Sequence, residues 1–251
     1  MKASGVEPIH IAAQYLAAAA ISLLDSKKDD SHSNLGFSVE QQYMTTRALN
    51  DDGDHFALSL QDFSLRWISS SSTLDFSLNK HKHHEVLSWI YSVLKPLELS
   101  DQYRYEFHYS LPYELPENFL LEASAESLEK DISMRSLAQR VLSEVLQQHS
   151  MISEIRIWPH HFDTGAYAQL PNNSEISIGM GLAIPDSMVD DYYFYLSGYK
   201  GNKPIDTISF ESLANGEWAR GDFQGAVLAA GDISKEEALL FFQEGITSYA
   251  Q

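Results

Sequence analysis

The alternation of apolar and polar positions predicts three consecutive β-strands in the N-terminal half of the chain. The alternating stretch follows Asn50-Asp51-Asp52-Gly53-Asp54, a sequence typical of a turn. A period of two places the apolar side chains of a strand on one face. The apolar positions are Phe56, Leu58, Leu60, Phe63, Leu65, Trp67, Leu74, Phe76 and Leu78. We therefore expect an antiparallel β-meander with one buried face.

Apolar residues at helical spacing predict four α-helices. The first follows Glu7-Pro8, a typical helix start, and its pattern up to Leu24 predicts an amphipathic helix. The last follows the capping box Ser234-Lys235-Glu236-Glu237. The other two are expected from Asn79, as the N-cap, to Pro96, and from Ser124 to His149.

Further strands are predicted in the second half. Aromatic residues alternate with polar ones from Tyr103 to Tyr109, and apolar ones alternate from Glu175 to Ile184. The turn Pro171-Asn172-Asn173-Ser174 predicts a hairpin that places Thr164 opposite Gly181. Shorter strands are expected at Tyr192–Leu196 and Gly225–Ala229.

These elements predict an α+β fold in which antiparallel β-meanders are backed by helices. A chain of 251 residues fits one domain, 1–251. Both halves also share the order helix, strands, helix, which leaves open two similar halves, 1–100 and 101–251.

Composition narrows the classes of partner. The chain has 35 acidic and 17 basic residues, a formal charge of −18, and no cluster of Lys and Arg that could neutralise successive phosphates. Nucleic acid and membranes are therefore not expected as partners. The absence of cysteine excludes disulfides and thiolate chemistry, and the expected location is the cytoplasm. The sequence does not determine the oligomeric state.

The strongest candidate for chemistry is Trp158-Pro159-His160-His161-Phe162-Asp163. His160, His161 and Asp163 could act as acid–base groups or as ligands of a divalent metal, because imidazole and carboxylate serve both purposes. Trp158, Tyr193 and Tyr195 are the candidate walls of a small-molecule site. Gly179 and Gly181 would let another backbone or side chain approach closely, and the space would also admit a ligand or an imidazole.

The same residues also fit a structural motif in which Asp163 accepts hydrogen bonds from a turn and backbone groups satisfy the imidazoles. The sequence favours neither interpretation decisively, and whether the chain is an enzyme stays open. No phosphate-binding loop, nucleophile elbow or His-Glu-x-x-His motif is present. No cofactor is therefore expected beyond the divalent metal, which the sequence leaves open.

The motif resembles an uncharacterised bacterial protein family with a Trp-Pro-His-His-Phe-Asp motif. The resemblance extends to Gly179-Met180-Gly181, to the aromatic strand Tyr192-Tyr193-Phe194-Tyr195 and to Leu35-Gly36-Phe37. It implies a cytoplasmic α+β protein and brings no assigned activity. Two functions therefore remain: a hydrolase-type acid–base or metal-assisted enzyme, and a module that binds a small molecule or a protein without catalysis.

Overall fold

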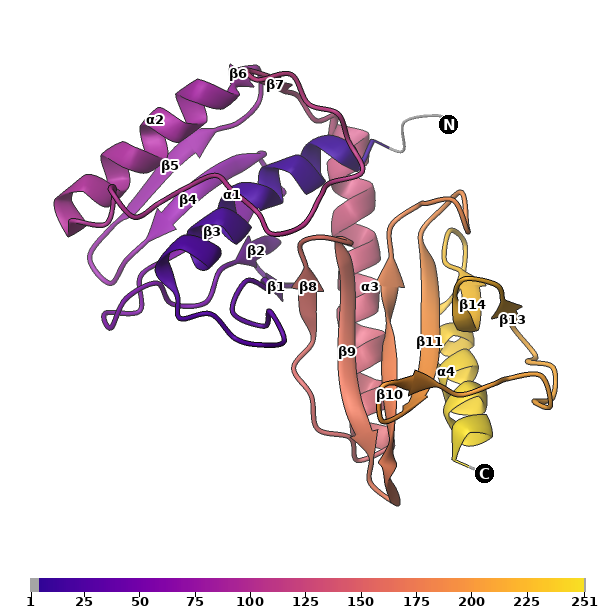
Figure 1. Cartoon of the computed structure of the whole chain (residues 1–251). Coiled ribbons are helices and arrows are strands. Elements are labelled where there is room, and N and C mark those ends of the chain that lie inside the picture. Colours follow the sequence, from indigo (N-terminus) through magenta and orange to yellow (C-terminus); the bar gives the residue numbers. More distant parts are fainter. Residues whose placement is uncertain (1–4, 251) are drawn as a thin grey trace. The chain divides into compact units, whose positions relative to one another are not determined.

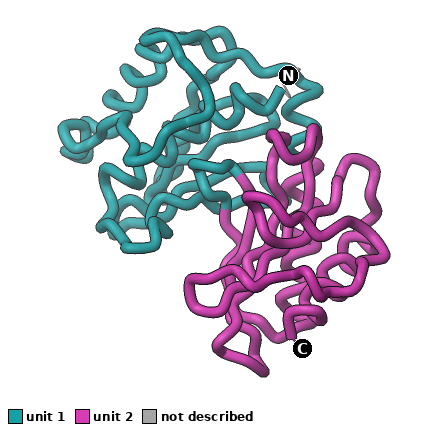
Figure 2. Tube along the Cα trace, turned by 45° about the vertical axis from the view of Figure 1, so that its right-hand side comes forward, with its two compact units in different colours: residues 1–132, 157–162 teal, residues 133–156, 163–251 magenta. Residues whose placement is uncertain are grey.

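The computed structural model describes residues 5–250 and confirms the α+β fold class. The described residues form four α-helices and three antiparallel sheets. They divide into two compact units, shown in Figure 2: unit 1 contains residues up to 132 together with 157–162, and unit 2 contains 133–156 and 163–251. This division lies elsewhere than the alternative halves 1–100 and 101–251. One domain or two halves stays a prediction.

Unit 1 contains a five-stranded sheet and two helices that lie over it (Figure 1). The strand order is β1-β2-β3-β4-β5, and a separate small sheet pairs β6 with β7. The elements are α1 (Glu7–Leu23), β1 (Gly36–Ser38), β2 (Tyr43–Thr45), β3 (His55–Ser59), β4 (Ser64–Ile68), β5 (Thr73–Ser77), β6 (His81–Lys82), α2 (His83–Leu94), the 3₁₀ turn η1 (Lys95–Leu97) and β7 (Leu120–Leu121).

The predicted meander is confirmed as β3, β4 and β5. Phe56 pairs with Trp67, and Leu58 with Leu65, so their side chains share one buried face. Leu74 is an exception to the predicted burial, since 45% of it is exposed. It lies on β5, the edge strand, where the core no longer covers the sheet.

Helix α2 begins later than predicted. Its first residue is His83, and the N-cap is Lys82 rather than Asn79. The backbone N–H of Lys82 donates to the carboxylate of Glu85 at 2.8 Å. Residues 81 and 82 instead form β6, which pairs with β7, and the helix begins directly after this strand.

Helix α1 is buried on every side, so the prediction of an amphipathic helix is wrong. Every residue from Ile9 to Ala20 is buried, including His10 and Gln14. The small side chains at 17–20 let neighbouring segments approach the helix closely on all faces. A helix that is apolar all round belongs in a core rather than at a surface.

One of the segments against α1 is the aromatic stretch that was predicted as a strand. Residues 103–109 form no strand in the structure. The segment instead runs antiparallel to α1 (Figure 1): the backbone of Arg104 bonds to Ser22, and the hydroxyl of Tyr109 donates to Gln14 Oε1 at 2.7 Å. The alternation correctly indicates that one face of segment 103–109 points inward. That face packs against helix α1, and the segment pairs with no strand.

Unit 2 contains a second antiparallel sheet with strand order β13-β14-β11-β10-β9, and β12 pairs with β11. Its elements are β9 (Asp163–Leu170), β10 (Asn173–Ala183), β11 (Tyr193–Lys200), β12 (Lys203–Pro204), β13 (Glu217–Arg220), β14 (Gln224–Ala229) and α4 (Lys235–Tyr249). The predicted strands at 192–196 and 225–229 and the capping box at Ser234 are confirmed. Two elements continue across the division between the units: α3 (Ala125–Gln148) and β8 (Arg156–Trp158).

The helices of unit 2 cover one face of this sheet. On α4, Phe242 contacts Phe194 with ring centroids 5.5 Å apart. Phe194 pairs with Leu182, which pairs with Thr164, so all three side chains share that face. Thr164 accepts a hydrogen bond from Arg135 of α3 at 2.8 Å, which places α3 over the same face.

The predicted register of the β9–β10 hairpin is wrong by one residue. Thr164 pairs with Leu182 rather than with Gly181. The connection is shorter than predicted, because Leu170 pairs with Asn173, and a β-bulge between Asn173 and Ser177 takes up the additional residues. The shift places Gly181 opposite Gly165.

The burial of α1 predicts a large effect from overpacking. Ala17→Leu adds volume where the side chain has no exposed surface, and should lower the free energy of unfolding by about 1–3 kcal/mol. Ala125→Leu at the exposed start of α3 is the matched control and should change it by less than about 0.5 kcal/mol. Urea unfolding followed by circular dichroism measures both. Equal effects in the two variants would contradict the fully buried placement of α1.

Candidate functional site

The candidate motif forms a tight turn at the end of β8. The N–H of Phe162 donates to the carbonyl of Trp158 at 2.7 Å, and Phe162 has a left-handed backbone with φ of 59°. Ile157, just before the turn, exchanges two backbone hydrogen bonds with Leu35, which lie at 2.8 and 2.9 Å. Residues 157–162 therefore belong to unit 1.

Two polar side chains of the buried helix α1 hold this turn. The carbonyl of Pro159 accepts hydrogen bonds from His10 Nε2 at 2.7 Å and from Gln14 Nε2 at 2.9 Å. A carbonyl oxygen only accepts, so Nε2 of His10 carries a proton. The His10 ring also stacks on Phe162, with centroids 4.6 Å apart and planes 6° from parallel. Pro159 and Phe162 therefore have a structural role.

The two consecutive histidines project from the turn. His160 is half-buried and His161 is exposed, and their ring centroids lie 4.3 Å apart. Neither imidazole has a hydrogen-bond partner among the described residues. Trp158 lies edge-on to His160 at 6.3 Å. The turn thus presents two adjacent unpaired imidazoles beside an indole ring.

The surroundings of His160 include groups that the sequence did not indicate. The ring of Tyr109 lies 5.7 Å from that of His160. His108 Nε2 lies 3.2 Å from the carboxylate of Asp30. Burial lowers the pKa of His160 below its ordinary value, as do His161 and His108, whereas Asp30 acts in the opposite direction. The neutral form of His160 is therefore favoured at neutral pH.

Asp163 lies in unit 2 at the start of β9 and is buried. Its carboxylate accepts a hydrogen bond from the hydroxyl of Tyr195. Burial, and then the Asp163 carboxylate, raise the pKa of Tyr195 well above its ordinary value. The pair therefore consists of an un-ionised phenol that donates to a carboxylate.

The roomy strand predicted around the glycines is filled by Tyr195. A Cβ atom at Gly165 would lie 2.7 Å from the Tyr195 hydroxyl, and one at Gly181 only 2.6 Å from it. These two glycines make space for a side chain of the protein, so the close approach predicted at Gly181 is confirmed, and Tyr195 is the group that approaches. Beside Gly179, the neighbours of an added Cβ would be Ser197, Tyr199 and Tyr167.

The other tyrosine proposed as a wall is also held by a carboxylate. Tyr193 is buried, and its hydroxyl donates to Asp186 at 2.8 Å. Burial, and then Asp186, raise its pKa above the ordinary value. Both hydroxyls are thus engaged within unit 2.

The sequence-predicted residues therefore fall into two groups. Trp158, His160 and His161 lie together in unit 1, whereas Asp163, Tyr193 and Tyr195 lie together in unit 2. Among residues 5–250, no three His, Asp or Glu side chains are placed to hold a single metal ion. A metal bound by His160, His161 and Asp163 stays a prediction.

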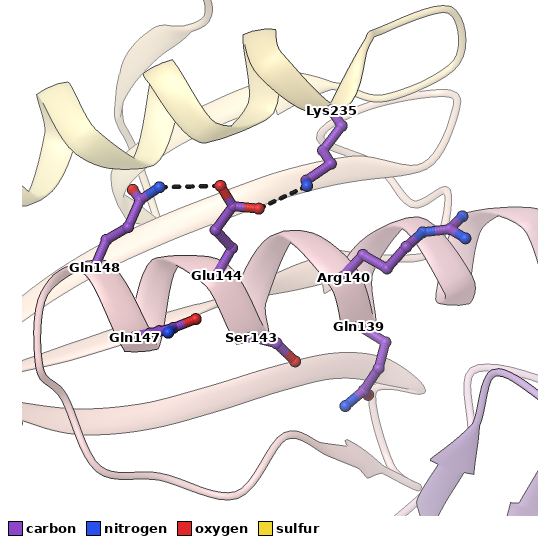
Figure 3. A pocket seen from close by; sticks show the side chains of 7 residues that line it. All are labelled: Gln139, Arg140, Ser143, Glu144, Gln147, Gln148 and Lys235. Atoms are coloured by element: carbon purple, nitrogen blue, oxygen red, sulfur yellow. Dashed lines mark hydrogen bonds and ion pairs between the residues drawn. The ribbon is translucent and has the colours of Figure 1, made fainter.

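Neither His160 nor His161 is among the residues that line the two hollows described next. The one in unit 2 is lined by polar side chains of α3 and by Lys235 at the start of α4 (Figure 3). Within it Glu144 bridges Lys235 at 2.6 Å and Gln148 at 3.0 Å. The one in unit 1 is lined by Tyr91, Ser92, Lys95, Ser100, Asp101 and Arg104.

Comparison with protein-family models, with curated proteins and with solved structures finds no match for this chain. Within the described residues, no helix combines the length and the apolar character needed to cross a membrane. The site must therefore be interpreted from its own chemistry.

The structural role of Phe162 predicts a strong effect of truncation. Phe162→Ala removes a fully buried ring and should lower the free energy of unfolding by about 3–5 kcal/mol. His161→Ala, on the same turn but exposed, should change it by less than about 0.5 kcal/mol. Chemical unfolding of both variants measures the difference. If Phe162→Ala were neutral, the turn would not be anchored as described.

The environment of His160 predicts an acid-shifted titration. Its pKa should lie below 6.5, and His161→Gln should raise it by removing a nearby positive charge. The unfolded chain binds a proton at His160 more readily than the folded chain does, because only the folded chain lowers this pKa. The contribution of His160 to the free energy of unfolding is therefore fully present above pH 6.5 and is lost as the pH falls through the folded pKa. NMR titration of the ring protons of His160 measures the shift. A pKa at or above 6.5 would contradict the described surroundings.

Proposed function

We propose that the chain carries an imidazole acid–base site for a small molecule at the Trp158–Phe162 turn. The observation that supports it most is the pair of unpaired imidazoles, His160 and His161, on a turn that buried hydrogen bonds hold in place. A structural role explains Pro159 and Phe162 but leaves both imidazoles without a function. Preorganised groups of this kind are typical of sites that act on a ligand.

The chemistry would rest on His160 as a proton acceptor. A half-buried imidazole with a lowered pKa is neutral near pH 7 and can take a proton from a water molecule that attacks an activated carbonyl. The protonated His160 can then return this proton to the leaving group, and His161 lies beside it, with ring centroids 4.3 Å apart. The rings of Trp158 and Tyr109 offer apolar surface to a small substrate. We therefore favour a hydrolase-type reaction.

Binding without catalysis is the second candidate. It is favoured by the absence of His160 and His161 from the residues that line the two described hollows. A catalytic site normally excludes water from the reacting atoms. In this alternative the imidazoles would contact a small molecule or a protein at the surface.

The setting we propose is the bacterial cytoplasm. A chain without cysteine is compatible with a reducing compartment. Its formal charge of −18 opposes binding to nucleic acid and to anionic membranes. A soluble metabolite is the partner most compatible with both properties.

Hydrolysis of p-nitrophenyl acetate, an activated ester, tests the proposal. A general base contributes roughly 10²–10⁴-fold to a rate, so His160→Gln should remove most of the rate above buffer. The wild-type rate should rise with pH through the lowered pKa of His160. His55→Gln is the matched control, because His55 lies in unit 1 but its Nδ1 lies 3.0 Å from the Gly53 carbonyl. Equal rates for wild type and His160→Gln would refute catalysis and favour the binding alternative.

A further inference from the structure

A continuous series of aromatic rings runs from the core of unit 1 to the surface turn. It begins at Tyr15 on α1, continues along the segment 103–109 and ends at His160 and Trp158. The centroid distances are 4.9 Å for Tyr15–Tyr105, 4.9 Å for Tyr105–Phe107, 5.3 Å for Phe107–Tyr109, 5.7 Å for Tyr109–His160 and 6.3 Å for His160–Trp158. Each member thus contacts the next.

The buried end of the series is a phenol paired with an imidazole. Tyr15 is 1% exposed, and its hydroxyl lies 2.8 Å from Nδ1 of His83, the first residue of α2. Burial, and then His84, lower the pKa of His83, so its ring is neutral near pH 7 and can accept a proton. A phenol bonded to a neutral base can lose its proton whenever it loses an electron.

The middle of the series contains a hydroxyl that packing does not explain. The Tyr105 oxygen is buried without a hydrogen-bond partner among the described residues. A buried unsatisfied polar group destabilises the folded state. Phe107, two residues along, shows that phenylalanine fits this segment. The Tyr105 hydroxyl therefore opposes stability, whereas its electron-donating oxygen makes this ring easier to oxidise than the ring of a phenylalanine.

We propose that this series is a one-electron transfer path that connects Trp158 at the surface with the buried Tyr15–His83 pair. The chain has no cysteine, and among its aromatic side chains tyrosine and tryptophan lose one electron most readily. Trp158 is half-buried, so a one-electron oxidant in solution can reach it. The path shares Trp158, His160 and Tyr109 with the proposed ester-hydrolysis site but does not require that activity.

The electrons and protons balance with one external oxidant of the radical class. The oxidant takes one electron from the indole of Trp158, whose N–H proton passes to water and returns when the indole is reduced. The electron that reduces the indole comes from Tyr15 and crosses the rings of Tyr105, Phe107 and Tyr109, which keep their protons. As Tyr15 loses its electron, its hydroxyl proton moves to Nδ1 of His83. The products are a neutral tyrosyl radical and an imidazolium, and a one-electron reductant with return of the proton restores both.

Pulse radiolysis of the full chain with azide radicals tests the path. Azide radicals oxidise tryptophan, and the absorption of the indolyl radical should decay as that of the tyrosyl radical grows, at a rate independent of protein concentration. Trp158→Phe and Tyr105→Phe should each remove the larger part of this intramolecular transfer. Tyr15→Phe should remove the long-lived tyrosyl signal in electron paramagnetic resonance.

The substitution Tyr105→Phe is the decisive variant, because it deletes only the unpaired hydroxyl and should leave the melting temperature unchanged or higher. Tyr109→Phe breaks the same path nearer the surface and decides the question if Tyr105→Phe proves unstable. Tyr167→Phe, an exposed tyrosine of unit 2 outside the series, should behave like wild type. Wild-type transfer in a folded Tyr105→Phe or Tyr109→Phe variant would overturn the proposal, as would transfer that Trp158→Phe leaves intact.

Discussion

A helix without an exposed face must find a partner for every polar group that it buries, and this constraint organises unit 1. Helix α1 buries His10 and Gln14 among alanines and aliphatic residues. Their donors meet at the Pro159 carbonyl, and the Gln14 oxygen accepts from Tyr109. An unsatisfied amide or imidazole in such a place destabilises the fold by roughly 1–3 kcal/mol. Two distant segments of the chain are therefore fixed by one helix.

The sequence predicted most elements because their local patterns agree with the tertiary structure. The meander from Phe56 to Phe76 and the capping box at Ser234 are determined by neighbours close in sequence. The strand predicted at 103–109 is wrong because alternation indicates that one face points inward but does not indicate which element covers that face. The predicted β9–β10 register is wrong because the bulge between Asn173 and Ser177 has no clear signature in the sequence.

The candidate site was predictable only in part. Doubled histidines after a proline indicated that the motif was unusual, and the structure gives Pro159 and Phe162 a role that residue types alone left open. Tyr109, His108 and Asp30 were missed, because they come near His160 only through the folding of segments far apart in sequence. Tyr195 fills the space above Gly165 and Gly181, and its assignment to a ligand wall stays a prediction.

Unit 1 is built from two separate stretches of the chain, so its packing can be completed only after the second stretch has been synthesised. The chain leaves this unit at residue 132 and returns to it for only six residues, 157–162. Until those residues have emerged from the ribosome, the donors of His10 and Gln14 lack their acceptor and the Phe162 ring is missing from its place against His10. Domains generally fold as units during synthesis, the N-terminal one first. Unit 1 reaches its full set of contacts only after α3 has been made.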